Sequence, residues 1–390
     1  MTCLGKLLYR YLLFMYRIIH ILFFAYMLLT ACAPGSEQRD WNLTPDSLRH
    51  SSLLSIARAD SFVLVTVKNA WVEGKDLHRY ILVPEASPMP QHYPEGTVLR
   101  TPLRSVVMHN AVHAALVEEL GCASAIKGLC DVEYVHTPAL RQLLDNGNIA
   151  DAGSSVQSDV EHYISLRADA VFTAPIEHAS YGILEKVGIP LVECADYMEA
   201  SALGRVEWVR FFGLLFDCED RANALFEAVE KRYSDLCSIA QKATHRPRLM
   251  ADVLHGAAWY MPGGKSYLGN LFADAGADYI LADDEHSGSI PLSFETVFSL
   301  ASDADFWLIK EARAGVFSYA DLRREHASYT SFAPWKKRNI YCCNTLHTDF
   351  YEHIPFHPDV LLLELVQLFH PELFPTPTPA KYYLPLKQPF

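Results

Sequence analysis

The 390-residue sequence has little positive charge, with 33 lysine and arginine residues against 46 aspartate and glutamate residues and a formal charge of −13. No local run of basic residues offsets this balance. Because so acidic a chain repels a phosphate backbone, nucleic-acid binding is the first function that we set aside. A hydrophobic share of 50% also excludes a disordered chain, a collagen and a coiled coil.

Common catalytic and nucleotide-binding signatures are also missing. The run Gly263-Gly264-Lys265-Ser266 ends like a phosphate loop but lacks its upstream glycine, so nucleotide binding is not expected. A turn before a helix N-terminus is the simpler interpretation, and such a terminus can hold an anionic group of a ligand. The sequence has no Gly-x-Ser-x-Gly elbow and no nucleophilic cysteine signature. We therefore expect no resident cofactor.

Paired cysteines are not a strong feature either. Seven of the nine cysteines lie beyond residue 32, at irregular spacings. An odd number at irregular spacing excludes a disulfide scaffold and the common zinc motifs. Cys122 and Cys130 are the best candidates for a disulfide, and buried free thiols are an equal alternative.

The N-terminus has the features of a secretory signal. Lys6, Arg10 and Arg17 precede an uncharged run at 21–29, and Leu-Thr-Ala stands directly before Cys32. This order is typical of a signal peptide, and the cysteine matches the bacterial lipobox, in which it becomes lipidated. An uncleaved anchor is the alternative, and either places the body outside the cytoplasm. Cleavage leaves 30 basic and 46 acidic residues, a charge of −16.

Alternating patterns predict strands early in the mature chain. Two short strands are expected within 61–68 and 78–83, and the proline- and glycine-rich stretch 86–101 is interpreted as a loop. From residue 104 to about 192, and again from residue 248, short apolar strands alternate with helical stretches. Such alternation indicates parallel sheets covered by helices.

Between these regions, residues 217–240 carry apolar side chains three and four positions apart. We expect a helix about 36 Å long there, with Asp217 as its N-cap. A match of residues 161–172 to 295–306, identical at six of twelve positions, favours two similar lobes.

The sequence therefore predicts an α/β fold of two Rossmann-like lobes joined by a single long helix, with the ligand cleft between the lobes. The expected divisions are a signal peptide (1–31), a tether (32–50), an N-terminal lobe (51–203), a connecting helical region (204–243), a C-terminal lobe (244–375) and a proline-rich tail (376–390).

Ligands of parallel α/β folds bind beyond the carboxyl ends of the strands. The residues expected there, which we interpret as the lining of the cleft, are His109, Asn110, His113, Glu177, His178, Tyr181 and Tyr197 in the first lobe and Trp259, Tyr260, Lys265, Ser266, Asn344 and Tyr351 in the second. His109 and His113 have the spacing of a metal pair on a helix, but capping and packing explain them better.

Two glutamates fit helix capping. Ser158 and Glu161 have the spacing of a capping box. Ser293 can cap the later helix, with Glu295 in its first turn, where the helix dipole favours an acid.

Several short motifs follow one another along the chain in an order that is more specific than any one of them. They are Pro-Leu-Arg-Ser-Val-Val at 102–107, Asp-Val-Glu at 159–161, Leu-Arg-Ala-Asp-Ala-Val at 166–171, Gly-Ile-Pro at 188–190, Ala-Gly-Ala-Asp-Tyr at 275–279 and Leu-Ser-Phe-Glu at 292–295. On these motifs, residues 55 to 372 resemble the solute-binding proteins of ABC importers for ferric siderophores, haem or cobalamin. Stretches 203–208 and 259–266 resemble a subgroup typical of Bacteroidetes lipoproteins.

The resemblance implies a monomeric receptor, lipid-anchored at Cys32 on the periplasmic face of a bacterial membrane, that catalyses no reaction. It would capture an iron complex (ferric siderophore or haem) or cobalamin and deliver it to an ABC permease and its ATPase. By position, Glu161 and Glu295 would meet arginines of the permease.

The ligand itself is not fixed by the resemblance. The tyrosines and tryptophan of the expected cleft suit a flat macrocycle or a hydroxamate complex, and His113 or His178 is a candidate ligand of haem iron. The alternatives are an extracytoplasmic metal-dependent enzyme and a protein that binds a bare metal ion in a histidine-rich cleft.

Overall fold

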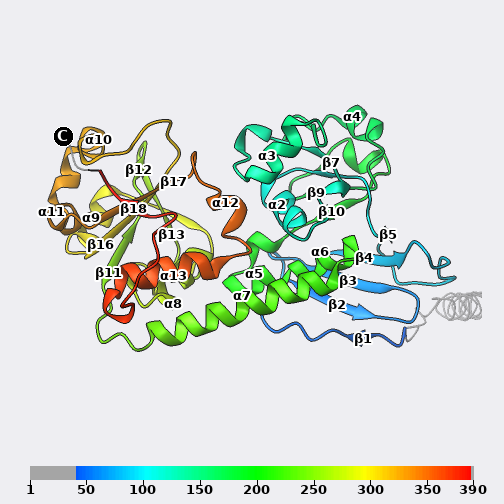
Figure 1. Ribbon diagram of the computed structural model, residues 1–390, viewed down its shortest axis with the longest axis horizontal. Helices are drawn as coiled ribbons and strands as arrows, with labels where there is room; N and C mark the ends of the chain where they lie inside the picture. The colour runs from blue at the N-terminus through cyan, green and yellow to red at the C-terminus, as the bar shows by residue number, and fades with distance from the viewer. Residues whose placement is uncertain (1–40, 388–390) are drawn as a thin grey trace, which may run out of the picture. The chain divides into compact units, whose positions relative to one another are not determined.

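The computed structural model describes residues 41–387 (Figure 1). Contacts divide the chain into residues 1–43 and residues 44–390, and the architecture below is that of the second unit. The expected signal peptide and Cys32 lie outside the described residues. No helix between residues 41 and 387 has both the length and the apolar character needed to cross a membrane.

The second unit opens with a five-stranded sheet in the order β1-β2-β3-β4-β5. Its strands are β1 (Thr44–Pro45), β2 (Leu54–Arg58), β3 (Val63–Lys68), β4 (Asp76–Pro84) and β5 (Thr97–Thr101). The two strands expected at 61–68 and 78–83 are confirmed as β3 and β4. The loop expected at 86–101 is wrong at its end, because β5 buries Leu99 and Thr101 and pairs in parallel with β4.

The N-terminal lobe contains a fully parallel sheet in the order β10-β9-β6-β7-β8. Its strands are β6 (Val106–Met108), β7 (Ile126–Leu129), β8 (Ala150–Asp151), β9 (Ala170–Thr173) and β10 (Leu191–Glu193), and its helices are α2 (Ala111–Glu119), α3 (Pro138–Asp145) and α4 (Val160–Ser165). This is the doubly wound order of Rossmann folds. Its direction reverses between β6 and β9, where such folds bind ligands.

The C-terminal lobe has the order β14-β11-β16-β17-β18, parallel except for the last strand. These strands are β11 (Arg248–Ala251), β14 (Asp278–Tyr279), β16 (Phe306–Glu311), β17 (Ile340–Asn344) and β18 (Leu384–Pro385). The winding direction reverses between β11 and β16, as in the flavodoxin-like order. A small antiparallel sheet adds β12 (Leu254–His255), β13 (Ala258–Pro262) and β15 (Ser289–Leu292).

Six helices surround these sheets. They are α8 (Tyr267–Asp274), α9 (Phe294–Ala301), α10 (Tyr319–Glu325), α11 (Ala333–Lys337), α12 (Phe350–His353) and α13 (Pro358–Phe369). The proline-rich segment expected to form a tail packs on this lobe as far as it is described. Glu364 on α13 accepts hydrogen bonds from the backbone N–H groups of Lys381 and Tyr382 at 2.7 and 3.0 Å.

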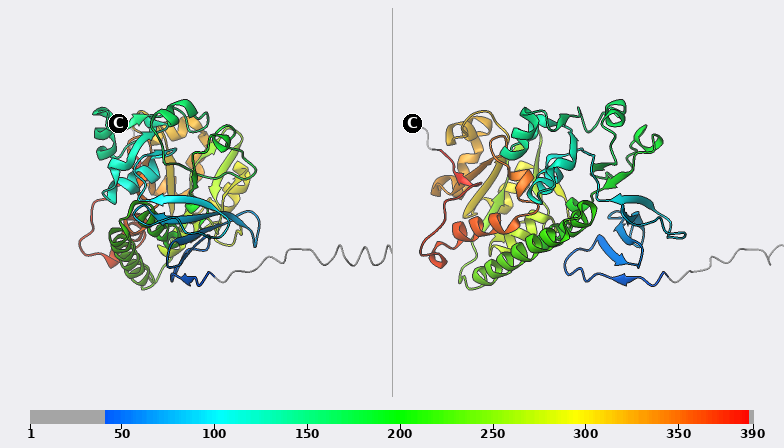
Figure 2. Two further views of the ribbon diagram at one scale, coloured as in Figure 1. Left: turned by 90° about the vertical axis from the view of Figure 1, so that its right-hand side faces the viewer. Right: turned by 45° about the vertical axis from the view of Figure 1, so that its right-hand side comes forward.

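Helices α5 (Ala202–Glu207) and α6 (Val209–Phe216) lead into the long helix α7 (Glu219–Ala240), which runs along both lobes (Figure 1 and the right-hand view of Figure 2). Its 22 residues span about 33 Å. The predicted N-cap is wrong: Asp217 adopts a left-handed conformation at the end of α6, and Cys218 precedes α7.

The buried stripe of α7 belongs to two hydrophobic cores. Phe226 and Val229 pack in the core of the N-terminal lobe. Tyr233 and Leu236, one to three turns further on, pack in the core of the C-terminal lobe. The α/β fold with two lobes and a long connecting helix is therefore confirmed, while the domain boundaries given above stay predictions.

One further local prediction was wrong, one was confirmed, and the structure has one of two alternatives left open for the cysteines. The capping box fails because α4 begins one residue later than expected: Asp159 caps it by accepting from the His162 N–H at 3.0 Å. Ser293 does cap α9, with Glu295 in its first turn. Of the proposed disulfide partners, Cys130 instead contacts the Tyr163 hydroxyl at 3.2 Å, and all seven cysteines of the described residues are free thiols.

Candidate functional site

Two cavities, here named the N chamber and the C chamber, are each lined by residues of both lobes and share Tyr197 and Tyr351. Their volumes are about 530 and 540 Å³, within the range of small-molecule sites. Tyr197 comes from the N-terminal lobe and Tyr351 from the C-terminal lobe, and both rings are partly exposed. The space between the lobes therefore holds two cavities that share two lining residues.

The N chamber lies at the switch point of the N-terminal sheet. Residues 110–113 follow β6 and Ala174 follows β9. Its wall is mostly carbon, with Ala111, Val112 and Leu346 among the lining residues and Tyr134 at the rim. Asn110 also lines this chamber, and its side chain caps α2 by accepting from the His113 N–H.

A buried charged cluster forms part of this wall. The Asp196 carboxylate contacts His113 Nε2 at 2.7 Å and Arg205 Nε at 2.9 Å. Burial raises the pKa of Asp196, but His113 and Arg205 outweigh that effect and the net pKa lies below its usual value. The carboxylate is therefore ionised, and it holds both partners in place.

The C chamber lies at the switch point of the C-terminal sheet. Asp252 directly follows β11, and Lys310 lies near the end of β16. Lys310 Nζ contacts both carboxylate oxygens of Asp252 at 2.8 Å. Burial lowers the pKa of Lys310, but Asp252 outweighs it, so the net pKa is raised and the side chain carries its charge.

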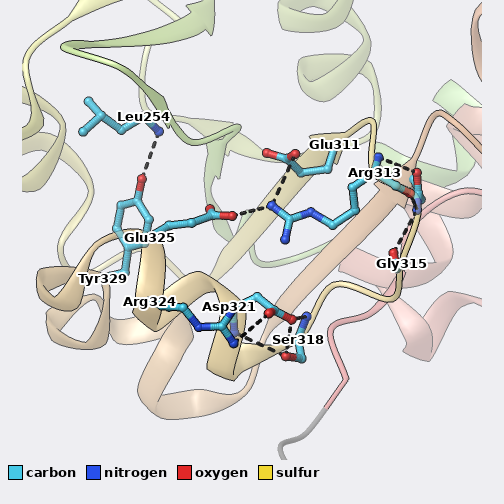
Figure 3. Close-up of polar contacts among 10 residues, drawn as sticks. Leu254, Glu311, Arg313, Gly315, Ser318, Asp321, Arg324, Glu325 and Tyr329 are labelled. Carbon is cyan, nitrogen blue, oxygen red and sulfur yellow. Dashed lines mark hydrogen bonds and ion pairs between the residues drawn. The ribbon is translucent and has the colours of Figure 1, made fainter.

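A network behind β16 fixes the end of this strand (Figure 3). Arg313 pairs with Glu325 on α10 and lies 3.9 Å from Glu311, the residue after Lys310. The Leu254 N–H donates to the Tyr329 hydroxyl at 3.0 Å in the same region. These contacts tie β16 and β12 to α10 and the 3-10 turn that follows it. They lie next to Lys310, the residue of β16 that lines the C chamber.

Six of the predicted cleft residues line a chamber: Asn110, His113, Tyr197, Tyr260, Ser266 and Tyr351. The Ser266 hydroxyl is already engaged, because it caps α8 and donates to the Gly263 carbonyl at 2.7 Å. A Cβ built on Gly263 or Gly264 would meet backbone carbonyl oxygens at 2.3 Å. This turn therefore packs closely against backbone carbonyl oxygens, and an anionic group at the N-terminus of α8 stays a prediction.

In the N-terminal lobe, four predicted residues line neither chamber. His109 is buried beneath the sheet edge, 3.2 Å from the Thr173 hydroxyl and 3.3 Å from that of Tyr163, and burial lowers its pKa to about 4. Tyr181 donates to Glu193 at 2.8 Å. Glu177 and His178 are exposed on the loop after β9.

In the C-terminal lobe, three predictions fail for similar reasons. Trp259 is fully buried and donates to the Ala251 carbonyl at 2.9 Å, because alternation along β13 turns Tyr260 outward and Trp259 inward. Lys265 is exposed and faces Glu285 at 4.0 Å. The Asn344 amide donates to the Arg313 carbonyl at 2.8 Å and so fixes a loop.

Neither proposed iron-ligating histidine is suitably placed. His113 Nε2 is bonded to Asp196, and its Nδ1 is buried without a partner among the described residues. His178 lies outside both chambers. His109 and His113 face different partners, and no three metal-binding side chains converge anywhere in residues 41–387.

Sequence reasoning missed the strongest polar features of the cleft. Asp252 and Lys310 each stand at a strand end, but neither was among the residues expected to line the cleft. Arg205 lines the N chamber from α5, far from any strand end. Neither residue spacing nor a motif in the sequence indicates its contact with Asp196.

The lobes are also bridged directly beside the cleft, where α12 meets α2 (Figure 1). Glu352 accepts from the His136 N–H and the Thr137 hydroxyl, both at 2.8 Å. His357 Nε2 contacts Glu119 at 2.8 Å. This bridge adjoins Tyr351 and closes one side of the N chamber.

Comparison with proteins of known sequence gives relatives over most of the chain. The uncharacterized lipoproteins MJ0878 and MJ0872 of Methanocaldococcus jannaschii are 26% and 23% identical to it. The first alignment covers 71% of this chain and 67% of the relative, and the second covers 80% of each.

Solved structures share the fold at low identity. An ABC-type Fe3+-hydroxamate transport system from Saccharomonospora viridis superimposes with a TM-score of 0.57 and 17% identity, covering 78% of this chain and 98% of that one. A periplasmic heme binding protein from Pseudomonas aeruginosa gives 0.53 and 19%, covering 72% and 97%. The model of the periplasmic binding protein family matches residues 127–332, more than half of the sequence, and on this evidence the chain belongs to that family of solute-binding proteins.

Proposed function

We propose that this protein is the substrate-binding lipoprotein of an ABC importer, which captures an iron complex (ferric siderophore or haem) or cobalamin and delivers it to the permease. The observation that carries the proposal is the pair of chambers at the two switch points, joined by Tyr197 and Tyr351. A protein that captures a ligand between two lobes needs a site lined by both lobes, and it needs no catalytic side chain.

The size and walls of the chambers support a bulky ligand. Each chamber exceeds 500 Å³, and the N chamber offers carbon surface with aromatic rings at its rim. Aromatic and aliphatic walls suit a macrocycle or a chelate with an apolar exterior. The similar structures described as Fe3+-hydroxamate and heme-binding proteins fit this ligand class.

A lipid anchor on the periplasmic face of the membrane is part of the proposal. The Leu-Thr-Ala-Cys sequence ending at Cys32 supports it, as do the relatives named lipoproteins. The metal-dependent alternatives lose their main support, because His109 and His113 turn to different partners. We therefore propose a monomeric receptor without catalytic activity.

Docking to the permease and its ATPase is assigned to Glu161 and Glu295. Each is exposed in the first turn of a helix, α4 in one lobe and α9 in the other. Neither makes an ion pair within residues 41–387, so both carboxylates are available to arginines of a partner.

The ligand class is tested with the purified protein by native mass spectrometry and absorbance, using hemin, cyanocobalamin and ferric siderophores as probes. We expect a one-to-one complex with at least one probe. A lack of binding to all of them would contradict the proposed ligand class.

Docking is tested with the double variant Glu161→Ala/Glu295→Ala. Uptake of the bound ligand in cells should fall at least about tenfold while ligand affinity stays unchanged, because only charge-assisted contacts to the permease are removed. Glu227→Ala, which removes an exposed glutamate from α7, is the matched control. Normal uptake by the double variant would refute the assignment.

A further inference from the structure

The two chambers differ in chemistry although they share two tyrosines. Carbon dominates the wall of the N chamber, whereas the C chamber is lined by Asp252, Lys310 and several hydroxyl groups. Resting on the proposed function, we propose that the ligand is an amphiphilic anion. Its apolar body occupies the N chamber, and an ionised acid group binds Lys310 in the C chamber.

Lys310 is the cation available to such a group. Among the residues lining the C chamber it is the only lysine or arginine. Arg205 lines the N chamber instead, where it pairs through Nε with the buried Asp196 carboxylate. The Lys310 side chain is 14% exposed, so the surrounding protein removes most of the water that would compete with a ligand.

The hydrogen bonds of Lys310 leave room for a ligand. An ammonium group has three N–H donors, and Nζ makes its hydrogen bonds to the two oxygens of Asp252, both at 2.8 Å. The third donor is free for an acceptor entering the chamber. An acid group of the ligand would complete the set and share the lysine with Asp252.

Asp252 acts as a positioning residue for this lysine. Its N–H and carbonyl are held by Leu308 at 2.7 Å and the Trp307 indole at 2.8 Å, and its carboxylate also accepts from the Lys310 backbone N–H. Its φ of +58° is a left-handed conformation that few residues other than glycine adopt. Such conformations persist where the surroundings fix them, often at ligand sites.

The other acidic residue of the chamber does not compete for Lys310. Glu199 accepts hydrogen bonds from Ser52 and Leu53 and from the Trp208 indole, at 2.8 to 3.1 Å. Both oxygens of Glu199 are therefore occupied, and they attach residues 52–53 to Trp208, the residue before α6. On the remaining wall, Ser287 and Ser289 add hydroxyl donors that suit a carboxylate.

This arrangement divides the ligands named in the proposed function. A tetrapyrrole with ionised carboxylates, or a ferric chelate with a free carboxylate, matches both chambers. A neutral hydroxamate chelate or neutral cobalamin leaves Lys310 without its acid partner. The structure thus favours the anionic members of the class.

The test compares hemin with hemin dimethyl ester, which differ only in the ionisable acids, by titration in the same mild detergent. Wild-type protein should bind hemin about tenfold or more tightly than the ester, as expected for a charge-assisted contact. The variant Lys310→Met/Asp252→Asn removes both charges together and should lose this preference. Asp252→Asn alone should keep it, because the lysine remains.

Lys265→Met is the matched control, since Lys265 is an exposed lysine near the chamber that does not line it. Melting curves establish that each variant is folded. Equal binding of hemin and its ester by wild type, or a preference that survives in the double variant, would overturn the inference while leaving the proposed function intact. Failure of wild type to bind hemin, cyanocobalamin and ferric siderophores alike would overturn both.

Discussion

The switch points of the two lobes occupy equivalent places in their sheets but hold different chemistry. In the N-terminal lobe the charged group, Asp196, is 1% exposed and is paired with both His113 and Arg205. In the C-terminal lobe the carboxylate of Asp252 is 13% exposed and stands in the chamber wall with Lys310. Topology therefore selects where a ligand binds, and the side chains at that place decide which ligand it is.

The same comparison separates structural charges from available ones. Asp196 has both oxygens occupied by two partners from different elements, so its loss should be felt as instability. Asp252 has one charged partner at the edge of a cavity, so its loss should cost less stability. Three comparisons of a more buried with a more exposed side chain extend this contrast, in order of decreasing effect.

The largest effect is expected inside the C-terminal lobe, at Trp259→Ala. Trp259 is fully buried against Trp307 and Tyr329, and its removal should lower the free energy of unfolding by about 3–5 kcal/mol. Its neighbour Tyr260 is 50% exposed and lines the C chamber, so Tyr260→Ala should change stability by no more than about 0.5 kcal/mol. Chemical denaturation of both variants measures the difference. Similar losses at the two positions would show that the alternation along β13 is misassigned.

A paired substitution compares the two aspartates. Asp196→Asn should cost about 3 kcal/mol, because this carboxylate is 1% exposed and is the charged partner of both His113 and Arg205. Asp252→Asn should cost about 1 kcal/mol, because this carboxylate is 13% exposed and has one charged partner, Lys310. Urea denaturation at neutral pH gives both values. The reverse order would contradict the division between a structural and an available carboxylate.

The smallest effect is a pH dependence from His109. Burial lowers its folded pKa to about 4, below the ordinary 6.5, so between these values the unfolded chain binds the proton and the folded chain does not. Stability from this group is therefore complete above pH 6.5 and falls as the pH drops toward 4, by about 2 kcal/mol at pH 5. His109→Gln should flatten the profile of unfolding free energy in this window.

The matched control for this profile is His178→Gln, which removes an exposed histidine from the same lobe. It should leave the wild-type profile in place. A profile for His109→Gln that runs parallel to wild type between pH 4 and 6.5 would show that His109 does not lose its proton on folding.

Much of the fold could be read from local pattern. Alternating strands and helices predict both lobes, and apolar spacing predicts α7 to within two residues at its start, since both depend on neighbours in sequence. β5 was missed because its short alternating run follows a loop rich in proline and glycine. The packing of Lys381 and Tyr382 against Glu364 is equally invisible, since it joins segments that no periodicity relates.

The site was harder to predict than the fold. Position at strand ends correctly places Tyr197, Tyr351 and Asn110, but it cannot tell an inward side chain from an outward one. Trp259 and His109 were misplaced for that reason, as each turns into the core. The ion pair of Asp252 and Lys310 joins residues 58 positions apart, so only the three-dimensional structure brings it to notice.

The division of α7 between two cores has a consequence for how the protein can be cut. Its buried residues pack in the N-terminal core up to Val229 and in the C-terminal core from Tyr233, about one turn further along the same helix. A break in the backbone there would leave each stripe with its own lobe, but each core would still lose residues that the other half supplies: Phe356 from the N-terminal core, and Ala202 and Leu203 from the C-terminal core. Neither half expressed alone should survive limited proteolysis, so the molecule behaves in assembly as one indivisible piece rather than as two modules on a linker.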